Sequence, residues 1–261
     1  MRVVEAGREN SNPVVLVPGW GCGAWIFHDI LPHLASSGFH AMAVELKGHG
    51  LSDKPDDEHE YTNDAMRDHL AEIVDALGLD RTHMIGHSMG AAIAAELAAA
   101  EPERISSLVL AAPVGFAGVP GMQFFRLITP RFALPLLEHL ASRLLIRAML
   151  SVVYGSIRKP SNLDVEEFYA PTRLPGFVRS LRYILHEFDW ERPFPMVSIP
   201  AMTVFGSEDV LSPAADSERY RGKPAIIVEG AGHVLFDEAP EILNGAITGF
   251  LSGQVYISDY A

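Results

Sequence analysis

A serine set between glycines is the residue in this chain whose surroundings point most directly to chemistry. The pentapeptide Gly-His-Ser-Met-Gly at 86–90 follows an apolar run at 82–85 and precedes an alanine-rich stretch at 91–100. This pattern predicts a strand that turns sharply into a helix, with Ser88 at the apex in a strained backbone conformation that exposes its hydroxyl. The terminal glycines suit such a turn because the strand and the helix approach each other closely there. We therefore predict that Ser88 is a nucleophile.

A serine hydroxyl is a weak nucleophile at neutral pH, so it needs a base and a carboxylate that orients the base. In sheets of parallel strands, ligands meet at the carboxyl ends of the strands, so these partners should follow later strands. Asp209 follows the apolar run 201–205, and His233 follows the run 225–228. The order Ser88, Asp209, His233 is the order that accompanies a nucleophile elbow. We predict that His233 is the base and Asp209 the acid.

Other titratable side chains compete for these roles. Glu208 precedes Asp209, but the shorter carboxylate favours Asp209. His87 adjoins the serine, yet neighbouring strand residues point to opposite faces, which favours a structural role. His49 lies in a glycine-rich loop, where a structural role is also favoured. Cys22 has no evident base beside it and is interpreted as a small loop residue.

The pattern of apolar residues predicts the elements that position these groups. Strands are expected at 3–4, 14–17, 40–46, 82–86, 107–111, 201–205 and 225–228, and helices at 25–34, 62–77, 89–100 and 240–250. Strands that alternate with helices predict an α/β fold with a mainly parallel, doubly wound sheet. Thr62 or Asn63 is expected to cap the second helix.

The alternation stops at Pro113. From 114 to 199 the chain has helical segments, many prolines and many aromatic residues, but no convincing strand. We predict a core domain formed by 1–113 and 200–261, with 114–199 inserted as a helical cap. Most cap aromatics should pack within the protein. Some are expected to line a pocket above the serine, which would favour an apolar substrate.

The bulk composition excludes several classes of partner. The chain has 261 residues, of which 48% are apolar, and a net charge of −13. An evenly acidic protein of this kind repels phosphate backbones and anionic membrane surfaces, so we expect no nucleic-acid partner. We find no apolar signal segment and no run of about 18 apolar residues, and therefore expect no membrane span.

The single cysteine, Cys22, excludes an internal disulfide and fits a reducing compartment, so a cytoplasmic location is expected. No convincing set of metal ligands is present. The glycine-rich segment 19–23 does not have the spacing of a dinucleotide loop, and it lacks the lysine of a phosphate loop. We expect no cofactor and no metal. The oligomeric state is left open.

Three further motifs carry a resemblance to a known family. The heptapeptide Lys-Gly-His-Gly-Leu-Ser-Asp at 47–53, the turn Gly-Ser-Glu-Asp at 206–209 and the Gly-His pair at 232–233 resemble segments of α/β-hydrolases with a helical cap. The resemblance spans nearly the whole chain and is to the branch of esterases, haloperoxidases and C–C hydrolases. It implies the same roles for Ser88 and its two partners.

The resemblance also implies an oxyanion hole. Its donors would be the backbone N–H groups of Trp20 and Met89. The chain departs from the family pattern at Pro18, where histidine is usual, and this puts the rigidity of the loop in question. Glu45 and Lys47 stand where the family usually has aspartate and arginine, and we interpret both as structural.

A serine at 88, rather than an aspartate, argues against haloalkane dehalogenase and epoxide hydrolase chemistry. The expected function is a serine hydrolase, a carboxylesterase that cleaves a small to medium, mostly apolar ester through an acyl-enzyme. Hydrolysis of a C–C bond, as in meta-cleavage product hydrolases, is an alternative, as are thioesterase and lactonase activities. A third hypothesis, from a different functional class, is a ligand-binding receptor or a cofactor-free lyase on the same scaffold.

Overall fold

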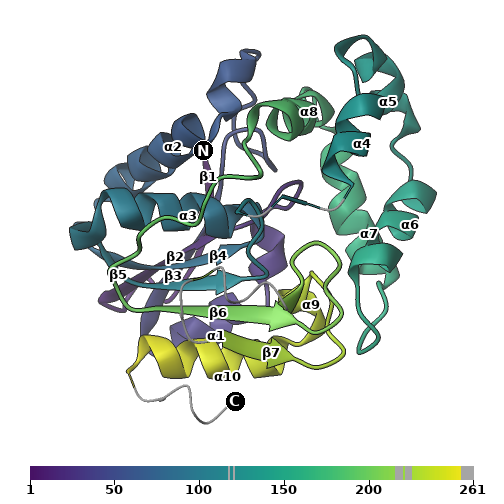
Figure 1. Ribbon diagram of the computed structural model, residues 1–261. Helices are drawn as coiled ribbons and strands as arrows, with labels where there is room; N and C mark the ends of the chain where they lie inside the picture. Colours follow the sequence, from purple (N-terminus) through teal and green to yellow (C-terminus); the bar gives the residue numbers. More distant parts are fainter. Residues whose placement is uncertain (117, 120, 215–219, 221–224, 254–261) are drawn as a thin grey trace.

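A single mostly parallel sheet forms the centre of the protein (Figure 1). The computed structural model describes residues 1–116, 118–119, 121–214, 220 and 225–253. The strands lie in the order β1-β3-β2-β4-β5-β6-β7, and only β1 runs antiparallel to its neighbour. They are β1 (Arg2–Ala6), β2 (Asn12–Val17), β3 (Phe39–Glu45), β4 (Thr82–His87), β5 (Ile105–Ala111), β6 (Ala201–Gly206) and β7 (Ala225–Val228). The predicted mainly parallel α/β sheet is confirmed.

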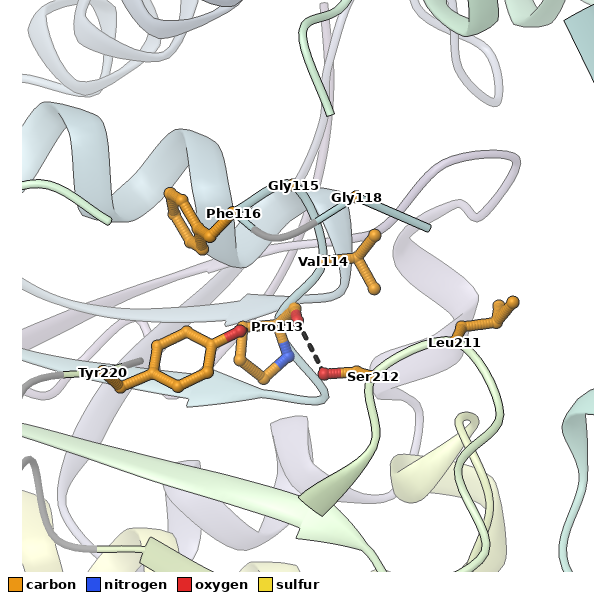
Figure 2. A pocket seen from close by; sticks show the side chains of 8 residues that line it. All are labelled: Pro113, Val114, Gly115, Phe116, Gly118, Leu211, Ser212 and Tyr220. Carbon is orange, nitrogen blue, oxygen red and sulfur yellow. Dashed lines mark hydrogen bonds between the residues drawn. The ribbon is translucent and has the colours of Figure 1, made fainter. Parts of the chain in front are cut away.

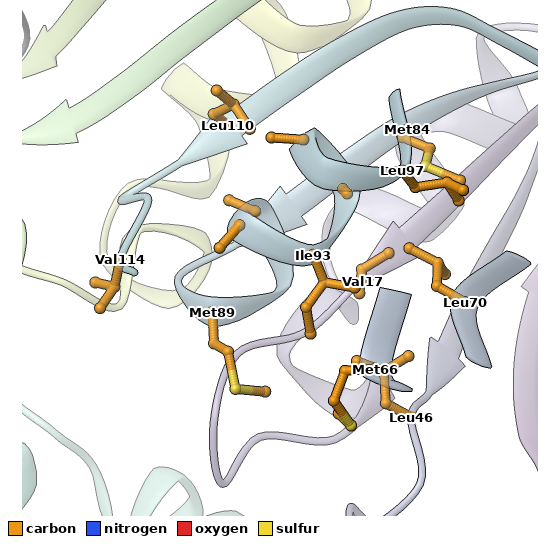
Figure 3. Packing of buried hydrophobic residues seen from close by; sticks show 14 of the residues in the cluster. Val17, Leu46, Met66, Leu70, Met84, Met89, Ile93, Leu97, Leu110 and Val114 are labelled. Carbon is orange, nitrogen blue, oxygen red and sulfur yellow. The ribbon is translucent and has the colours of Figure 1, made fainter. Parts of the chain in front are cut away.

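Helices cover both faces of the sheet. Figure 1 shows α2 (Asn63–Ala76) and α3 (Met89–Ala100) on one face, and α1 (Ile30–Ser36) and α10 (Pro240–Leu251) on the other. Each pair belongs to its own cluster of buried apolar side chains. The helix α3 lies at the centre of the first cluster, where small alanines let it approach the sheet closely (Figure 3). The sheet and α3 therefore form a rigid base beneath the elbow at Ser88.

The helix α2 begins as the sequence predicts. The Thr62 side chain accepts a hydrogen bond from the Ala65 N–H, which satisfies one free donor of the first turn. The helix buries its apolar stripe and ends before Gly78, whose positive φ of 69° a side chain would disfavour.

The predicted helix 25–34 is wrong as a single element, because the chain forms a 3-10 turn, η1 (Ala24–Phe27), and then α1. Pro32 explains the break. A proline is tolerated in the first turn of a helix but removes a hydrogen bond from its interior, so the helix containing Pro32 begins just before it. The short helix α9 (Leu235–Glu238) was not predicted. The remaining 3-10 turns are η2 (Glu58–Tyr61), η3 (Pro102–Arg104), η4 (Arg131–Ala133) and η5 (Ala170–Arg173).

Between β5 and β6 the chain forms a helical insertion. Its helices are α4 (Met122–Ile128), α5 (Leu134–Leu140), α6 (Arg143–Val153), α7 (Asn162–Tyr169) and α8 (Phe177–Glu187). Figure 1 shows α4 to α7 together at one side of the sheet. In the described part of this insertion the strand-like pairing is limited to one isolated bridge, between Phe116 and Glu191. As far as the structure describes the chain, none of its helices has the length and apolar character that a membrane span requires.

Candidate active site

The turn at Ser88 is a strained elbow between β4 and α3. Ser88 has φ 54° and ψ −124°, a backbone conformation that non-glycine residues rarely adopt. A Cβ atom on Gly86 would lie 2.4 Å from Ala91 Cα, so the approach of strand and helix requires glycine there. Gly90 has a different constraint from the predicted one. A Cβ atom at this position would lie 2.3 Å from the carbonyl oxygen of Val17, at the end of β2.

The structure brings Ser88, His233 and Asp209 together in one hydrogen-bonded series. His233 Nε2 lies 2.9 Å from Ser88 Oγ, and His233 Nδ1 lies 2.8 Å from Asp209 Oδ2. All three residues are buried, with less than a tenth of their surface exposed. Since Asp209 accepts from Nδ1, the unprotonated Nε2 faces the hydroxyl. The series can therefore move a proton from the serine to the imidazole.

Backbone donors hold the Asp209 carboxylate. Oδ1 accepts the N–H groups of Leu211 at 2.8 Å and Ser212 at 2.9 Å, which leaves Oδ2 for His233. Figure 2 shows the Ser212 hydroxyl donating to the carbonyl oxygen of Pro113 over 2.7 Å. Pro113 follows β5, so this bond ties the loop of the acid to a neighbouring strand end. The carboxylate is thereby oriented before any substrate arrives.

A small pocket lies beside this loop. The rings of Phe116 and Tyr220 lie at one end of it and Leu211 at the other, and its volume of about 10 Å³ has room for about one water molecule (Figure 2). Val114 also lines it, and the Val114 N–H donates to the Ser88 carbonyl oxygen over 3.3 Å. The pocket is therefore adjacent to the elbow.

A second buried carboxylate, Glu238, holds the loop of the base. It accepts the N–H groups of Gly232 at 2.9 Å and Val234 at 3.0 Å, on either side of His233. It also accepts the N–H of Gly155, beyond the end of α6, at 2.7 Å. Burial raises the pKa of Glu238, and the three N–H donors offset part of this effect. Glu238 was not predicted from the sequence. The only signal was an acidic pair within the otherwise apolar segment that follows His233.

The end of α6 contacts the base loop directly as well. The His233 N–H donates to the Val153 carbonyl oxygen over 2.7 Å. A Cβ atom on Gly155 would lie 2.2 Å from the Gly230 carbonyl oxygen, so only glycine permits this approach. The helical insertion and the base loop therefore pack as one unit.

His87 contacts the base loop from the opposite side. Its Nε2 lies 2.9 Å from the His233 carbonyl oxygen, to which it can donate. Burial and the nearby His233 lower the pKa of His87 to about 3, so the ring is neutral at physiological pH. These contacts fit the structural role that the sequence favoured and show that His87 supports the loop of His233.

The other competitors lie in different environments. Glu208 accepts the N–H and the hydroxyl of Ser156, at 2.7 Å and 2.6 Å, and is directed toward the insertion. Burial raises the pKa of the Cys22 thiol, which is therefore protonated at neutral pH. Burial lowers the pKa of His49 to about 4, so its buried ring is neutral.

Two backbone donors stand beside the serine. Among the described residues, neither the Trp20 N–H nor the Met89 N–H donates a hydrogen bond. Met89 is the first residue of α3, where backbone donors have no partner within the helix. A Cβ atom on Gly19 would lie 2.7 Å from Ser88 Cβ, so the Trp20 loop contacts the elbow.

The loop that contains Pro18 is held by contacts to the insertion. Trp20 Nε1 donates to the Leu181 carbonyl oxygen over 3.1 Å, and its ring packs edge-on against Trp190. Two nearby groups have structural partners. Glu45 is fully buried and accepts the N–H groups of Ala24 and Leu51, while Lys47 pairs with Glu60 at 2.6 Å. Within the described residues, no group of three or more His, Cys, Asp or Glu side chains is arranged to hold a metal ion.

Asp237, on the helix that follows the base loop, makes stability depend on pH. Burial raises the pKa of Asp237 from 3.8 to about 6, although the Tyr154 hydroxyl donates to its Oδ2 over 2.9 Å. Oδ1 has no hydrogen-bond partner among the described residues. The Asp237 carboxyl group therefore binds its proton more tightly in the folded chain than in the unfolded chain. The stability that protonation of Asp237 contributes is present at low pH and is lost as the pH rises through about 6.

We therefore expect Asp237→Asn to gain stability relative to the parent chain, by about 1–3 kcal/mol, as the pH rises from about 4 to about 7. Urea unfolding of both chains across this range measures the difference. The matched control is Asp80→Asn, at an exposed carboxylate, which should show no such trend. Parallel stability curves for the parent and Asp237→Asn would contradict the assignment.

Comparison with known proteins finds similar proteins over most of the chain. The family model described as alpha/beta hydrolase fold matches residues 12–240. The dihydrolipoyllysine-residue acetyltransferase component of the acetoin cleaving system of Pseudomonas putida is 26% identical over 260 residues. That match covers 96% of this chain and 66% of the relative. The pimeloyl-[acyl-carrier protein] methyl ester esterase of Aeromonas hydrophila is 29% identical, with 91% of this chain and 95% of the relative covered.

A solved structure shows the same fold. The meta-cleavage product hydrolase from Pseudomonas fluorescens IP01 superposes with a TM-score of 0.80 at 20% sequence identity. The superposition covers 97% of this chain and 94% of that hydrolase, so it includes the helical insertion.

Proposed function

This chain belongs to the alpha/beta hydrolase fold family, and on that premise we propose that it is a serine hydrolase that cleaves a small to medium, mostly apolar carboxylic ester. The observation that supports this most is the series from Ser88 through His233 to Asp209, with 2.9 Å and 2.8 Å between the paired atoms. Such a series activates a hydroxyl for attack on a carbonyl carbon.

In the proposed reaction, His233 Nε2 takes the proton of Ser88 Oγ while that oxygen attacks the ester carbonyl. Asp209 stabilises the imidazolium that forms. The N–H groups of Trp20 and Met89 donate to the oxyanion, and each donor of this kind contributes about 2.7–4 kcal/mol where it has been measured. His233 then protonates the leaving alcohol, and Ser88 is left acylated.

Water completes the cycle. His233, now neutral, takes a proton from a water molecule, which attacks the acyl carbon. The second oxyanion is stabilised by the same two N–H groups, and Ser88 leaves with the proton that His233 returns. The base must keep its position through both halves, and the contacts of Glu238 and His87 with its loop support that.

The apolar substrate is a prediction from the aromatic residues of the insertion, because the pocket beside the elbow has room for only about one water molecule. A methyl ester esterase among the relatives favours ester cleavage, at 29% identity over most of both chains. A second candidate is hydrolysis of a C–C bond, which the superposition on a meta-cleavage product hydrolase favours. Thioester or lactone cleavage would use the same groups.

Steady-state turnover separates these candidates. We expect p-nitrophenyl butyrate and hexanoate to be hydrolysed with a higher kcat/KM than the acetate, because longer acyl groups would contact more of the apolar side chains expected above the serine. A vinylogous diketone substrate, assayed in parallel by loss of its absorbance, should be turned over more slowly. Fast cleavage of the diketone with slow ester hydrolysis would reassign the reaction. Ligand-induced thermal stabilisation without turnover of either substrate would favour a receptor and overturn the proposal.

A further inference from the structure

An exposed apolar surface lies on the helical insertion, at the side of the molecule occupied by α4, α5 and α6 (Figure 1). We call it the cap surface and define it by six side chains that are each more than half exposed: Phe124, Leu127, Phe132, Leu136, Leu144 and Val152. Phe132 is 87% exposed and Leu144 79%. Single exposed apolar residues are common on soluble proteins, but several large ones on consecutive helices mark an interaction site.

The helix α6 has an exposed side as well as a buried one. Its Leu150 is buried in the core, and Ile146 packs against the same cluster. Leu144 and Val152 face outward, together with the partly exposed Met149. Polar residues spaced four apart, Arg143, Arg147 and Ser151, form a stripe on the same helix. The exposed side of α6 therefore carries both apolar and basic side chains, and no described part of this chain covers Leu144 or Val152.

The charge of this segment differs from that of the rest of the chain. Residues 122–159 contain six basic residues and one acidic residue, Glu138, in a protein with a net charge of −13. This segment therefore departs from the evenly spread negative charge on which the expected repulsion of anionic membrane surfaces rested. Basic and apolar side chains also alternate here. Arg131 is 72% exposed beside Phe132 and pairs with Glu58 at 3.9 Å, and Arg143 is 60% exposed beside Leu144 and pairs with Glu166.

We propose that the cap surface binds the surface of an anionic phospholipid bilayer. Exposed phenylalanine and leucine side chains insert at the depth of the headgroups, and neighbouring arginines contact lipid phosphates. A second copy of this chain fits less well, because it would bring two basic segments together. The inference goes beyond the reaction proposed at Ser88 and rests on the composition and exposure of the insertion alone.

Flotation of the full chain with lipid vesicles tests the proposal. We expect the protein to float with phosphatidylcholine vesicles that contain phosphatidylglycerol, and to float much less with phosphatidylcholine alone. The bound fraction should fall as salt is added, because salt screens the attraction between arginine and phosphate. The double variant Phe132→Ser, Leu144→Ser should reduce binding about tenfold or more, since two apolar side chains no longer insert.

Matched variants separate the parts of the proposal. Arg131→Ser should weaken binding to the anionic vesicles and leave the residual binding to phosphatidylcholine unchanged. Ile242→Ser, which removes an exposed apolar side chain on α10, should bind as the parent chain does. Circular dichroism and thermal unfolding show whether each variant is folded. Vesicle flotation itself does not depend on ester hydrolysis.

Three outcomes would overturn the proposal. They are failure of the parent chain to float with anionic vesicles, unchanged binding of the double variant, and equal binding to neutral and anionic vesicles. Analytical ultracentrifugation of the parent and the double variant tests the competing occupant. If the parent chain is a dimer and the double variant is a monomer, the cap surface binds a second copy of the chain instead.

Discussion

Ser88→Ala is expected to reduce kcat for p-nitrophenyl esters by about a million-fold, the loss measured when the serine of another hydrolase triad is removed. Alanine keeps the Cβ atom at the elbow but removes Oγ, the atom 2.9 Å from His233 Nε2. In the described part of the chain, the His233 ring has no hydroxyl partner besides Ser88 that could take its place. Initial rates of p-nitrophenol release, measured over a range of substrate concentrations, give kcat for both chains.

The control for this variant is Ser36→Ala, at an exposed serine at the end of α1, which should retain the activity of the parent chain. A fluorophosphonate probe gives an independent readout. It should add its mass to the peptide that contains Ser88 in the parent chain and not in Ser88→Ala. Retained turnover in a purified, folded Ser88→Ala chain would refute the nucleophile.

Asp209→Asn is expected to reduce kcat by about ten-thousand-fold, because it favours the wrong tautomer of the base. The N–H groups of Leu211 and Ser212 both point at Oδ1, so they should keep the asparagine oxygen in that position. The asparagine NH2 group would then face His233 Nδ1 and donate to it. The ring proton would move to Nε2, where it blocks proton transfer from Ser88. Steady-state kinetics measure this loss.

The adjacent carboxylate provides the control for Asp209. Glu208 contacts Ser156 rather than His233, so Glu208→Gln should keep kcat within a few-fold of the parent value. If Glu208→Gln abolished turnover and Asp209→Asn did not, Glu208 would be the acid. Thermal unfolding of both variants shows whether either effect comes from loss of the fold.

Most elements of the core could be predicted from the sequence because local patterns determine them. The buried strands are continuous apolar runs, and α2 has both its cap and its stop within the segment. Where the prediction of a single helix at 25–34 is wrong, the cause is still local, since Pro32 requires a new helix start. Such features depend on backbone and side-chain preferences of residues close together in the chain.

The contacts that hold the catalytic loops in place could not be predicted in the same way. Glu238 binds N–H groups on both sides of His233 and one from Gly155, and a carboxylate in sequence carries no sign of which distant donors it meets. Gly90 was expected to be small because of its own strand, whereas the end of β2 is what approaches it. Both depend on which segments the sheet order and the insertion bring together.

By itself, then, the sequence determined the parallel α/β core, the elbow at Ser88 and the residue types able to do hydrolytic chemistry. Only the tertiary structure decided the distances among side chains that lie as far as 145 positions apart, the supports of the base loop and the outer face of α6. The physical reason is that local patterns reflect interactions within a few residues. Hydrogen-bond partners, burial and exposure are set by packing between segments that are distant in the chain.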